Sequence, residues 1–310
     1  MMRIINSNAL VNLIKVTNLM FKGSIPAVIT PFEDNEAINF DQLESHIDFL
    51  IRNGSHGLVS CGTTGESPTL DHDEHKLVTE SILKFANGRV PVMSGCGSNS
   101  TKESIELVRH SEKIGVDAIL LVSPYYNKPT QEGLFKHFSS IARETYLPIY
   151  LYNIPGRSVV NIEIETMIKL SKIQNIVGVK DATSDLSLPL ETRITCGNEF
   201  ILLSGEDATF LSFLISGGSG CISVSANIIP ALYSKLFDLW SSGKINEAMK
   251  INEKIFPLNK ILFSETSPGP IKYALSLMGK CSSKLRLPLV EVSDDTKEKI
   301  KKVLASLDLI

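Results

Sequence analysis

Short apolar runs alternate with longer segments of helical periodicity along most of the chain. Each run holds four or five residues bounded by polar or turn-forming residues, the pattern of a buried parallel strand. The runs span residues 25–29, 57–60, 90–93, 118–122, 148–152, 176–179, 200–203 and 221–224. In residues 40–51 the apolar side chains recur every three or four positions, which predicts an amphipathic helix with Gly54 at its C-cap.

Eight strand–helix units within about 200 residues predict a (β/α)8 TIM barrel, because a doubly wound sheet more often has about five or six strands. We therefore predict an α/β fold whose catalytic barrel covers residues 20–243. Residues 244–310 show only helical patterns and are predicted to form a C-terminal helical region, broken at Pro257, Pro268 and Pro270. Residues 1–19 are expected to be an N-terminal extension, poorly ordered or an appendage, since Met20 would also serve as a start.

The composition is that of a large globular chain, and it argues against several classes of function. Of the 310 residues, 43% are hydrophobic and 21% are charged, which is enough apolar material for a sizeable core. The net charge of −3 gives no attraction to nucleic acid or to acidic membranes. The apolar stretch at 10–19 is shorter than the roughly 20 residues that a membrane span needs. Five scattered cysteines without metal-binding spacing predict a reducing, cytoplasmic location and no structural metal.

Lys180 directly follows the sixth predicted strand, and the first charge beyond a buried strand is a candidate for chemistry. A lysine held partly out of water can attack a carbonyl as a free amine and form a Schiff base. The simpler alternative is a solvated strand end, or an ion pair with Asp181. Taken alone, this stretch favours the simpler alternative.

Hydroxyl, phenol and guanidinium groups follow other predicted strands. Thr63 and Thr64 lie in a glycine-flanked loop after the second strand, where amides and hydroxyls can hold a small carboxylate. Tyr126 follows the fourth strand, Tyr152 ends the fifth, and Arg157 comes soon after it. Each has an ordinary structural explanation, as a turn, a packed ring or a surface cation. Because barrel strands end at one mouth, their convergence predicts a site where phenols and hydroxyls relay protons around a Schiff base.

Four motifs carry a resemblance to a known family. They are Gly-Thr-Thr-Gly-Glu-Ser at 62–67, Pro-Tyr-Tyr-Asn-Lys-Pro at 124–129, Tyr-Asn-Ile-Pro-Gly-Arg-Ser at 152–158 and Gly-Val-Lys-Asp-Ala-Thr at 178–183. From about residue 20 onward, the chain resembles the 4-hydroxy-tetrahydrodipicolinate (dihydrodipicolinate) synthases, a branch of the pyruvate-dependent class I aldolases. The resemblance implies a lyase that condenses pyruvate with L-aspartate 4-semialdehyde, the first committed step of the diaminopimelate route to lysine. It implies no metal and no organic cofactor.

The resemblance also implies a catalytic role for four residues. Lys180 would form the imine with pyruvate, and Tyr152 would carry protons during imine and enamine formation. Thr63 would link Tyr152 to Tyr126, which in the family reaches into the neighbouring subunit. A dimer would then be the smallest competent unit, and the family favours a homotetramer built as a dimer of dimers.

Four further residues would bind substrate. Thr64 would hold the pyruvate carboxylate, and Arg157 would bind the carboxylate of the semialdehyde. Gly205 and Ile222 match positions whose backbones line the pyruvate pocket.

Lysine-inhibited members of the family carry an effector pocket at the dimer interface. The matching positions here are Ser67, His72, His75, Asn99, Glu103 and Tyr125. Glu103 is also expected to complete a capping box with Ser100, and the two histidines also suit a helix surface. These residues therefore predict either feedback inhibition by lysine or an ordinary structural role.

Two other functions use parts of the same pattern. An N-acetylneuraminate or keto-deoxy sugar acid lyase would share Lys180 and Tyr152, but the Thr63–Thr64 pair and Arg157 favour the synthase. A barrel kept only for binding or regulation would not need this complete set of reactive groups.

Overall fold

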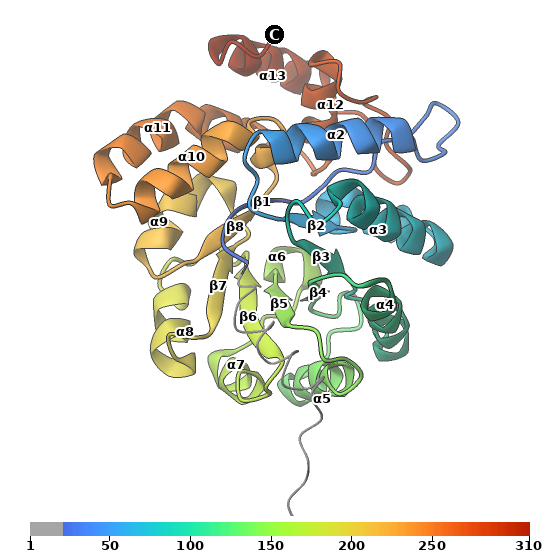
Figure 1. The fold of residues 1–310 in the computed structure, drawn as a ribbon, viewed down its shortest axis with the longest axis vertical. Coiled ribbons are helices and arrows are strands. Elements are labelled where there is room, and N and C mark those ends of the chain that lie inside the picture. The colour runs from blue at the N-terminus through green and yellow to red at the C-terminus, as the bar shows by residue number, and fades with distance from the viewer. Residues whose placement is uncertain (1–20) are drawn as a thin grey trace, which may run out of the picture.

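Eight parallel strands form the centre of the fold in the computed structural model, which describes residues 21–310. The predicted extension, residues 1–19, lies outside the described residues. The strands are β1 (Gly23–Pro26), β2 (Leu58–Ser60), β3 (Val92–Gly95), β4 (Ala118–Val122), β5 (Ile149–Asn153), β6 (Ile176–Asp181), β7 (Ile201–Ser204) and β8 (Gly220–Ser223). They follow one another in the order β1-β8-β7-β6-β5-β4-β3-β2, and a parallel bridge between Ala27 and Val59 joins the two ends. The predicted (β/α)8 TIM barrel is confirmed (Figure 1).

Helices surround the strands and continue beyond the last one. Those between strands are α2 (Phe40–Arg52), α3 (His72–Ala86), α4 (Thr101–Ile114), α5 (Gln131–Ala142), α6 (Pro155–Ser158), α7 (Ile164–Leu170), α8 (Leu188–Cys196) and α9 (Phe210–Ile215). After β8 come α10 (Pro230–Ser241), α11 (Ile245–Ile261), α12 (Gly269–Leu277) and α13 (Asp294–Ser306). Figure 1 shows α12 beside α2, and the Ser282 amide that follows α12 donates a 3.3 Å hydrogen bond to the Gln42 side chain, so the C-terminal region lies next to the first strand–helix unit.

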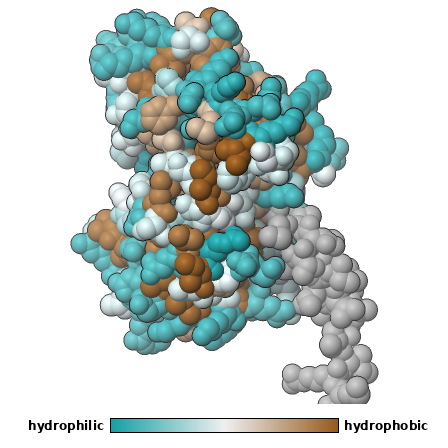
Figure 2. Space-filling view, turned by 90° about the vertical axis from the view of Figure 1, so that its left-hand side faces the viewer, coloured by the Kyte–Doolittle hydropathy of each residue, from teal (hydrophilic) through white to brown (hydrophobic). Residues whose placement is uncertain are grey.

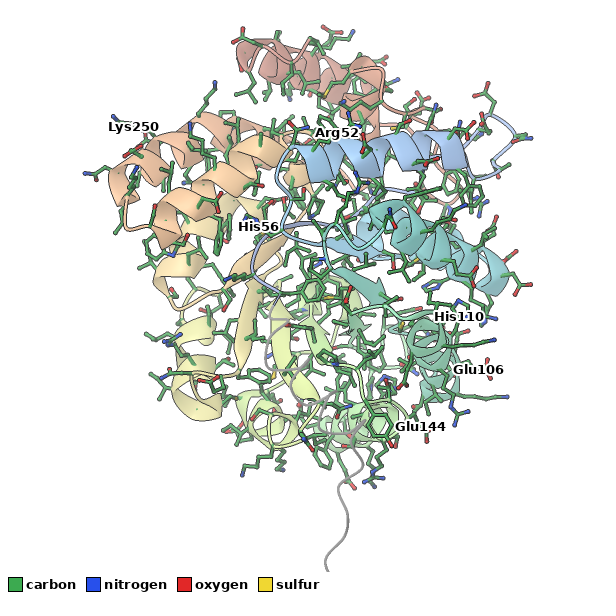
Figure 3. The ribbon with its side chains drawn as sticks, viewed as in Figure 1. Arg52, His56, Glu106, His110, Glu144 and Lys250 are labelled. Carbon is green, nitrogen blue, oxygen red and sulfur yellow. The ribbon has the colours of Figure 1, made fainter. Side chains whose placement is uncertain are left out.

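The apolar core has an inner and an outer layer, as expected for a barrel. The inner layer fills the barrel with side chains such as Val59, Leu120, Tyr152 and Ile222. The outer layer lies between the strands and the helices, and the C-terminal helices pack onto α10 through one large cluster. Charged side chains such as Arg52 on α2 and Lys250 on α11 come from the outer helices and are exposed (Figure 3). Among residues 21–310, no helix is long and apolar enough to cross a bilayer.

Every strand except β4 begins or ends one to three residues away from its predicted bounds, and one predicted helix break is absent. Strand β6 extends through Asp181, so Lys180 lies inside the strand and not beyond it. Strand β1 begins two residues early, at Gly23, because its register is set by pairing with β8. Helix α11 continues through Pro257, which was predicted to break it. Buried Ile255 and Leu258 flank this proline, and their packing outweighs the backbone hydrogen bond that proline removes.

The predicted helix caps are partly confirmed. Asn53 forms the C-cap of α2, and Gly54 follows it in the left-handed region with a φ of 86°. The Ser100 side chain caps α4 by accepting a hydrogen bond from the Glu103 amide. The expected reciprocal bond from the Glu103 carboxylate is replaced by other partners, described below.

Candidate active site

Lys180 and Tyr152 meet at the mouth of the barrel. Lys180 is 6% exposed, and its neighbours in the ladder are Tyr152 of β5 and Leu203 of β7. The Lys180 Nζ lies 3.9 Å from the centroid of the Tyr152 ring, which is 5% exposed. A buried amine is therefore held against a phenol in a site with little access to bulk water. Such a pair can provide a nucleophile and a nearby proton carrier.

Gly205 approaches the stem of this lysine. Its amide donates a 2.6 Å hydrogen bond to the Asp181 carbonyl, which fixes the turn after β7 beside β6. A Cβ added at Gly205 would lie 3.1 Å from the Lys180 Cε and 2.7 Å from the Ala182 Cβ. Glycine is therefore required here, because the backbone lies too close to Ala182 and Lys180 to leave room for a side chain. Ile222, in β8, is buried in the same inner layer as Tyr152.

The loop from Cys61 to Glu66, called here the hydroxyl loop, carries both threonines. Its first and last residues have positive φ values of 48° and 54°, and a short 3-10 helix, Thr63–Gly65, lies between them. The Thr64 side chain is buried, and that of Thr63 is half-buried. The Thr30 hydroxyl holds the loop by donating a 2.7 Å hydrogen bond to the Gly65 carbonyl. This bond ties the loop to the segment that follows β1.

Two acidic residues after β7 were not assigned a role from the sequence. The carboxylate of Asp207 is buried and accepts hydrogen bonds from the amides of Val224 (2.9 Å) and Ser225 (3.0 Å), so it ties the β7 turn to the end of β8. Burial raises the pKa of Glu206, the negative charge of Asp207 adds to that rise, and the positive charges of Lys180 and Arg157 oppose it. Their position after a barrel strand was the only sequence signal for either residue.

Arg157 lies on the short helix α6, with an exposed guanidinium. It lines a cavity of about 400 Å³ together with Thr63 of the hydroxyl loop. Thr63 thus contacts a cavity on the same side of the barrel as the buried lysine, and Arg157 can reach an anion that enters it.

Five of the six predicted effector residues line this same cavity, namely Ser67, His72, His75, Glu103 and Tyr125. The sixth, Asn99, is not among the lining residues, and its carbonyl accepts a hydrogen bond from the Asn127 side chain. The structure therefore brings most of the predicted effector set together.

Glu103 is the charged centre of the effector set. Its carboxylate pairs with His72 Nε2 at 2.8 Å and accepts a hydrogen bond from the Ser98 hydroxyl. These partners replace the predicted capping box, because a carboxylate aimed at the cavity cannot also reach the amide of Ser100. Burial and the charge of Glu103 raise the pKa of Tyr125. Burial lowers the pKa of His75 to about 4, so its neutral ring donates to the Gly95 carbonyl at 2.9 Å.

Tyr126 is separate from the cavity and open to solvent. Its side chain is 89% exposed, it does not line the cavity, and its φ of 73° lies in the left-handed region. A bulky residue rarely adopts this conformation without a functional reason. Within residues 21–310, no group of three or more His, Cys, Asp or Glu side chains is arranged to hold a metal ion.

Comparison with known proteins gives one consistent family. Residues 20–307 match the profile of the Dihydrodipicolinate synthetase family. A relative from Rhodospirillum centenum, named 4-hydroxy-tetrahydrodipicolinate synthase, is 50% identical over 94% of this chain and 100% of its own.

Two solved structures also match nearly the whole chain. The chloride-inhibited dihydrodipicolinate synthase from Acinetobacter baumannii, complexed with pyruvate, is 39% identical, with a TM-score of 0.92 over 94% of this chain and 100% of its own. The synthase from Cyanidioschyzon merolae with lysine bound is 36% identical, with a TM-score of 0.91 over 94% of this chain and 99% of its own.

Proposed function

Because this chain belongs to the dihydrodipicolinate synthetase family of lyases, we propose that it condenses pyruvate with L-aspartate 4-semialdehyde to give 4-hydroxy-tetrahydrodipicolinate. The observation that carries the proposal is the buried Lys180 amine, held against Tyr152 and enclosed by Gly205. A relative solved with pyruvate supports the first substrate.

The proposed reaction begins with a covalent bond between enzyme and pyruvate. The Lys180 amine attacks the keto carbon, and loss of water gives an imine. Removal of a methyl proton converts the imine to an enamine, whose carbon attacks the aldehyde of the second substrate. The α-amine of that substrate then attacks the imine carbon, closes the ring and releases Lys180. One water is lost overall, and Lys180 ends as the free amine with which it began.

The neighbouring side chains fit the proton transfers and the binding of two carboxylates. Tyr152 is the proposed proton carrier, because its ring already contacts the lysine. Thr63 would pass the proton onward, and the buried Thr64 would hold the pyruvate carboxylate. Arg157 would bind the carboxylate of the semialdehyde at the cavity wall.

Backbone atoms would complete the pyruvate pocket. We place Gly205 and Ile222 along its wall, since the first touches the lysine stem and the second shares the inner layer with Tyr152. The reaction needs no redox group or Lewis acid, so none is proposed.

We further propose that the active unit is a homo-oligomer in which Tyr126 enters the site of a second subunit. Its 89% exposure and its strained backbone are explained if a neighbouring chain covers it. A tetramer would also cover the apolar side chains Leu190, Ile194 and Ile215, which are exposed on α8 and at the C-terminal end of α9. Figure 2, which faces α8 to α11, shows apolar residues gathered on this side of the molecule.

Lysine is the proposed effector of the cavity beside the site. Glu103 could pair with an ammonium group, and Ser67, His72, His75 and Tyr125, which line the cavity with it, would supply the remaining polar contacts. A relative solved with lysine bound supports this choice of ligand. Initial rates should fall as lysine is added, and Glu103→Gln should raise the lysine concentration needed for half-inhibition. A flat titration up to millimolar lysine would end this part of the proposal.

The cytoplasm is the proposed location. All five cysteines are free thiols, as expected in a reducing compartment.

A direct assay tests the reaction. Purified protein with pyruvate and L-aspartate 4-semialdehyde should form a product that the next reductase of such a route consumes, while N-acetylneuraminate and keto-deoxy-gluconate should not be cleaved. Cleavage of either sugar acid, with no condensation, would identify a different lyase that uses the same lysine.

A further inference from the structure

A buried ion pair joins the hydroxyl loop to the C-terminal helices. Lys272, on α12, is completely buried, and so is Glu66 at the end of the hydroxyl loop. The Lys272 Nζ donates a 2.6 Å hydrogen bond to Glu66 Oε1, although the two residues are separated by 206 positions in sequence. The mechanism proposed above uses neither residue.

The second oxygen of Glu66 is bound by the same part of the chain. Its Oε2 accepts a hydrogen bond from the Arg286 amide at 3.3 Å. The Arg286 guanidinium in turn binds both carboxylate oxygens of Glu74 at 2.6 Å. The Phe32 ring contacts both cations, with its centroid 4.1 Å from the Lys272 Nζ and 4.4 Å from the Arg286 Cζ. Both oxygens of the Glu66 carboxylate are thus bound by residues that follow the barrel in sequence.

Stability alone is a poor explanation for this arrangement. Removing two charges from water costs several kcal/mol per ion, and an apolar pair of similar volume is often as stable or more stable. Burial lowers the pKa of Lys272, and the charge of Glu66 opposes that shift. A buried pair of this kind does, however, specify one geometry, because each charge must meet its partner.

The position of Glu66 indicates which geometry is specified. It follows Thr63, Thr64 and Gly65 directly, and its φ of 54° sets the direction in which the hydroxyl loop ends. On its other side, the chain continues into Ser67 at the cavity wall. Fixing the Glu66 carboxylate therefore fixes the angle at which both threonine side chains are presented.

We propose that Glu66 and Lys272 are positioning residues for pyruvate, through which helix α12 holds the hydroxyl loop in its binding geometry. This inference rests on the function proposed above, because it assigns the threonines to the pyruvate site. Neither residue touches the substrate. Their effect on the reaction passes through Thr63 and Thr64.

Three variants separate positioning from simple stabilisation, namely Lys272→Met, Glu66→Gln and the double variant. Lys272→Met leaves Glu66 buried without its partner, so its unfolding temperature should fall. The double variant removes both charges, and its unfolding temperature should recover toward that of the wild type. In all three, the KM for pyruvate should rise about tenfold or more, while the KM for the semialdehyde changes less than about threefold, because a shifted loop misplaces one carboxylate site only.

The decisive comparison is between stability and pyruvate KM in the double variant. Recovery of stability with a persistently raised pyruvate KM supports positioning. A pyruvate KM within about twofold of the wild type in the double variant would overturn the proposal, since a purely structural pair changes the amount of active enzyme and not its affinity. If Lys272→Met does not fold, the double variant alone gives the same decision.

Two controls complete the experiment. Lys299→Met removes a lysine that pairs with Asp295 on the surface of α13, and it should leave both KM values unchanged. Borohydride trapping of pyruvate on the wild type is the second control. A wild type with no adduct on Lys180 means that the proposed function has failed. A wild type with the adduct, beside a double variant with normal pyruvate KM, means that only the positioning inference has failed.

Discussion

At the scale of single residues, the chemistry depends on how closely backbone and side chains enclose the Lys180 stem. Gly205→Ala places a methyl group 3.1 Å from the Lys180 Cε and 2.7 Å from the Ala182 Cβ. The lysine must then move away from its position over the Tyr152 ring. We expect the rate of adduct formation with pyruvate to fall about tenfold or more, because near-attack geometry is lost by shifts of less than about 1 Å. This rate is measured by adding borohydride at successive times, which stops the reaction and traps the adduct that has formed.

The same substitution at Gly156 is a matched control for that prediction. Gly156 lies on the same side of the barrel, and a methyl group there would meet no atom within 4 Å. Gly156→Ala should therefore form the adduct at the wild-type rate. Equal rates in the two alanine variants would show that Gly205 does not confine the lysine.

The sequence allowed the reactive residues to be predicted, but not the residues that hold them. Lys180 and Tyr152 could be paired because neighbouring barrel strands bring their ends together, a rule that needs only strand order. The partnership of Glu66 with Lys272 joins positions 206 residues apart, and no local pattern indicates it. Asp207 was missed for a related reason, since its partners are backbone amides beyond the next strand, which carry no sequence signal.

At the scale of helices and strands, three outer helices are each anchored by a buried histidine. His46 on α2 contacts the Asn227 oxygen at 3.0 Å, and His75 on α3 contacts the Gly95 carbonyl at 2.9 Å. His137 on α5 lies 2.9 Å from the Thr101 hydroxyl. Burial lowers the pKa of all three from 6.5 to about 4. The folded chain therefore keeps them neutral where the unfolded chain begins to bind protons.

This difference predicts a loss of stability in mild acid. Between pH 6.5 and about 4 the unfolded chain binds more protons at these sites, so the free energy of unfolding should fall as pH falls. Each histidine can contribute up to about 3 kcal/mol across that window. Because buried carboxyl groups titrate nearby, the test compares wild type with His46→Gln by urea unfolding at several pH values. The variant should show a shallower dependence, by close to one proton, and an identical slope would contradict the assignment.

Element types were predicted better than element ends. All eight strands were found from apolar runs, because a parallel strand covered on both faces has a nearly continuous apolar sequence. The ends depend on pairing instead, as shown by β6, which continues through Lys180 because Tyr152 and Leu203 flank it. Pro257 in α11 shows the same limit. The helix continues through it because packing of its buried neighbours outweighs the low helix propensity of proline.

At the scale of the whole molecule, the proposed site is complete only when a second copy supplies Tyr126. Lys180→Ala lacks the nucleophile, and Tyr126→Phe lacks the phenol that would be donated across the interface. A mixed dimer of the two would contain one complete site, with Lys180 from one chain and Tyr126 from the other. Refolding an equal mixture should therefore restore about a quarter of wild-type activity.

Parallel refolding of each variant alone provides the reference for that experiment. Each should stay at its own low activity, since every site in it has the same defect. A mixture that shows only the average of the two separate activities would place the whole site within one chain and remove the argument for a shared interface.

The proposed mechanism depends on one covalent bond, between the Lys180 amine and the keto carbon of pyruvate. Incubation of the full-length protein with pyruvate and borohydride, followed by peptide mass mapping, tests it most directly. We predict a single reduced pyruvate adduct on the peptide that contains Lys180, absent when pyruvate is omitted and absent in Lys180→Ala. An unmodified Lys180 in fully active protein, or an adduct on a different lysine, would contradict the proposed mechanism.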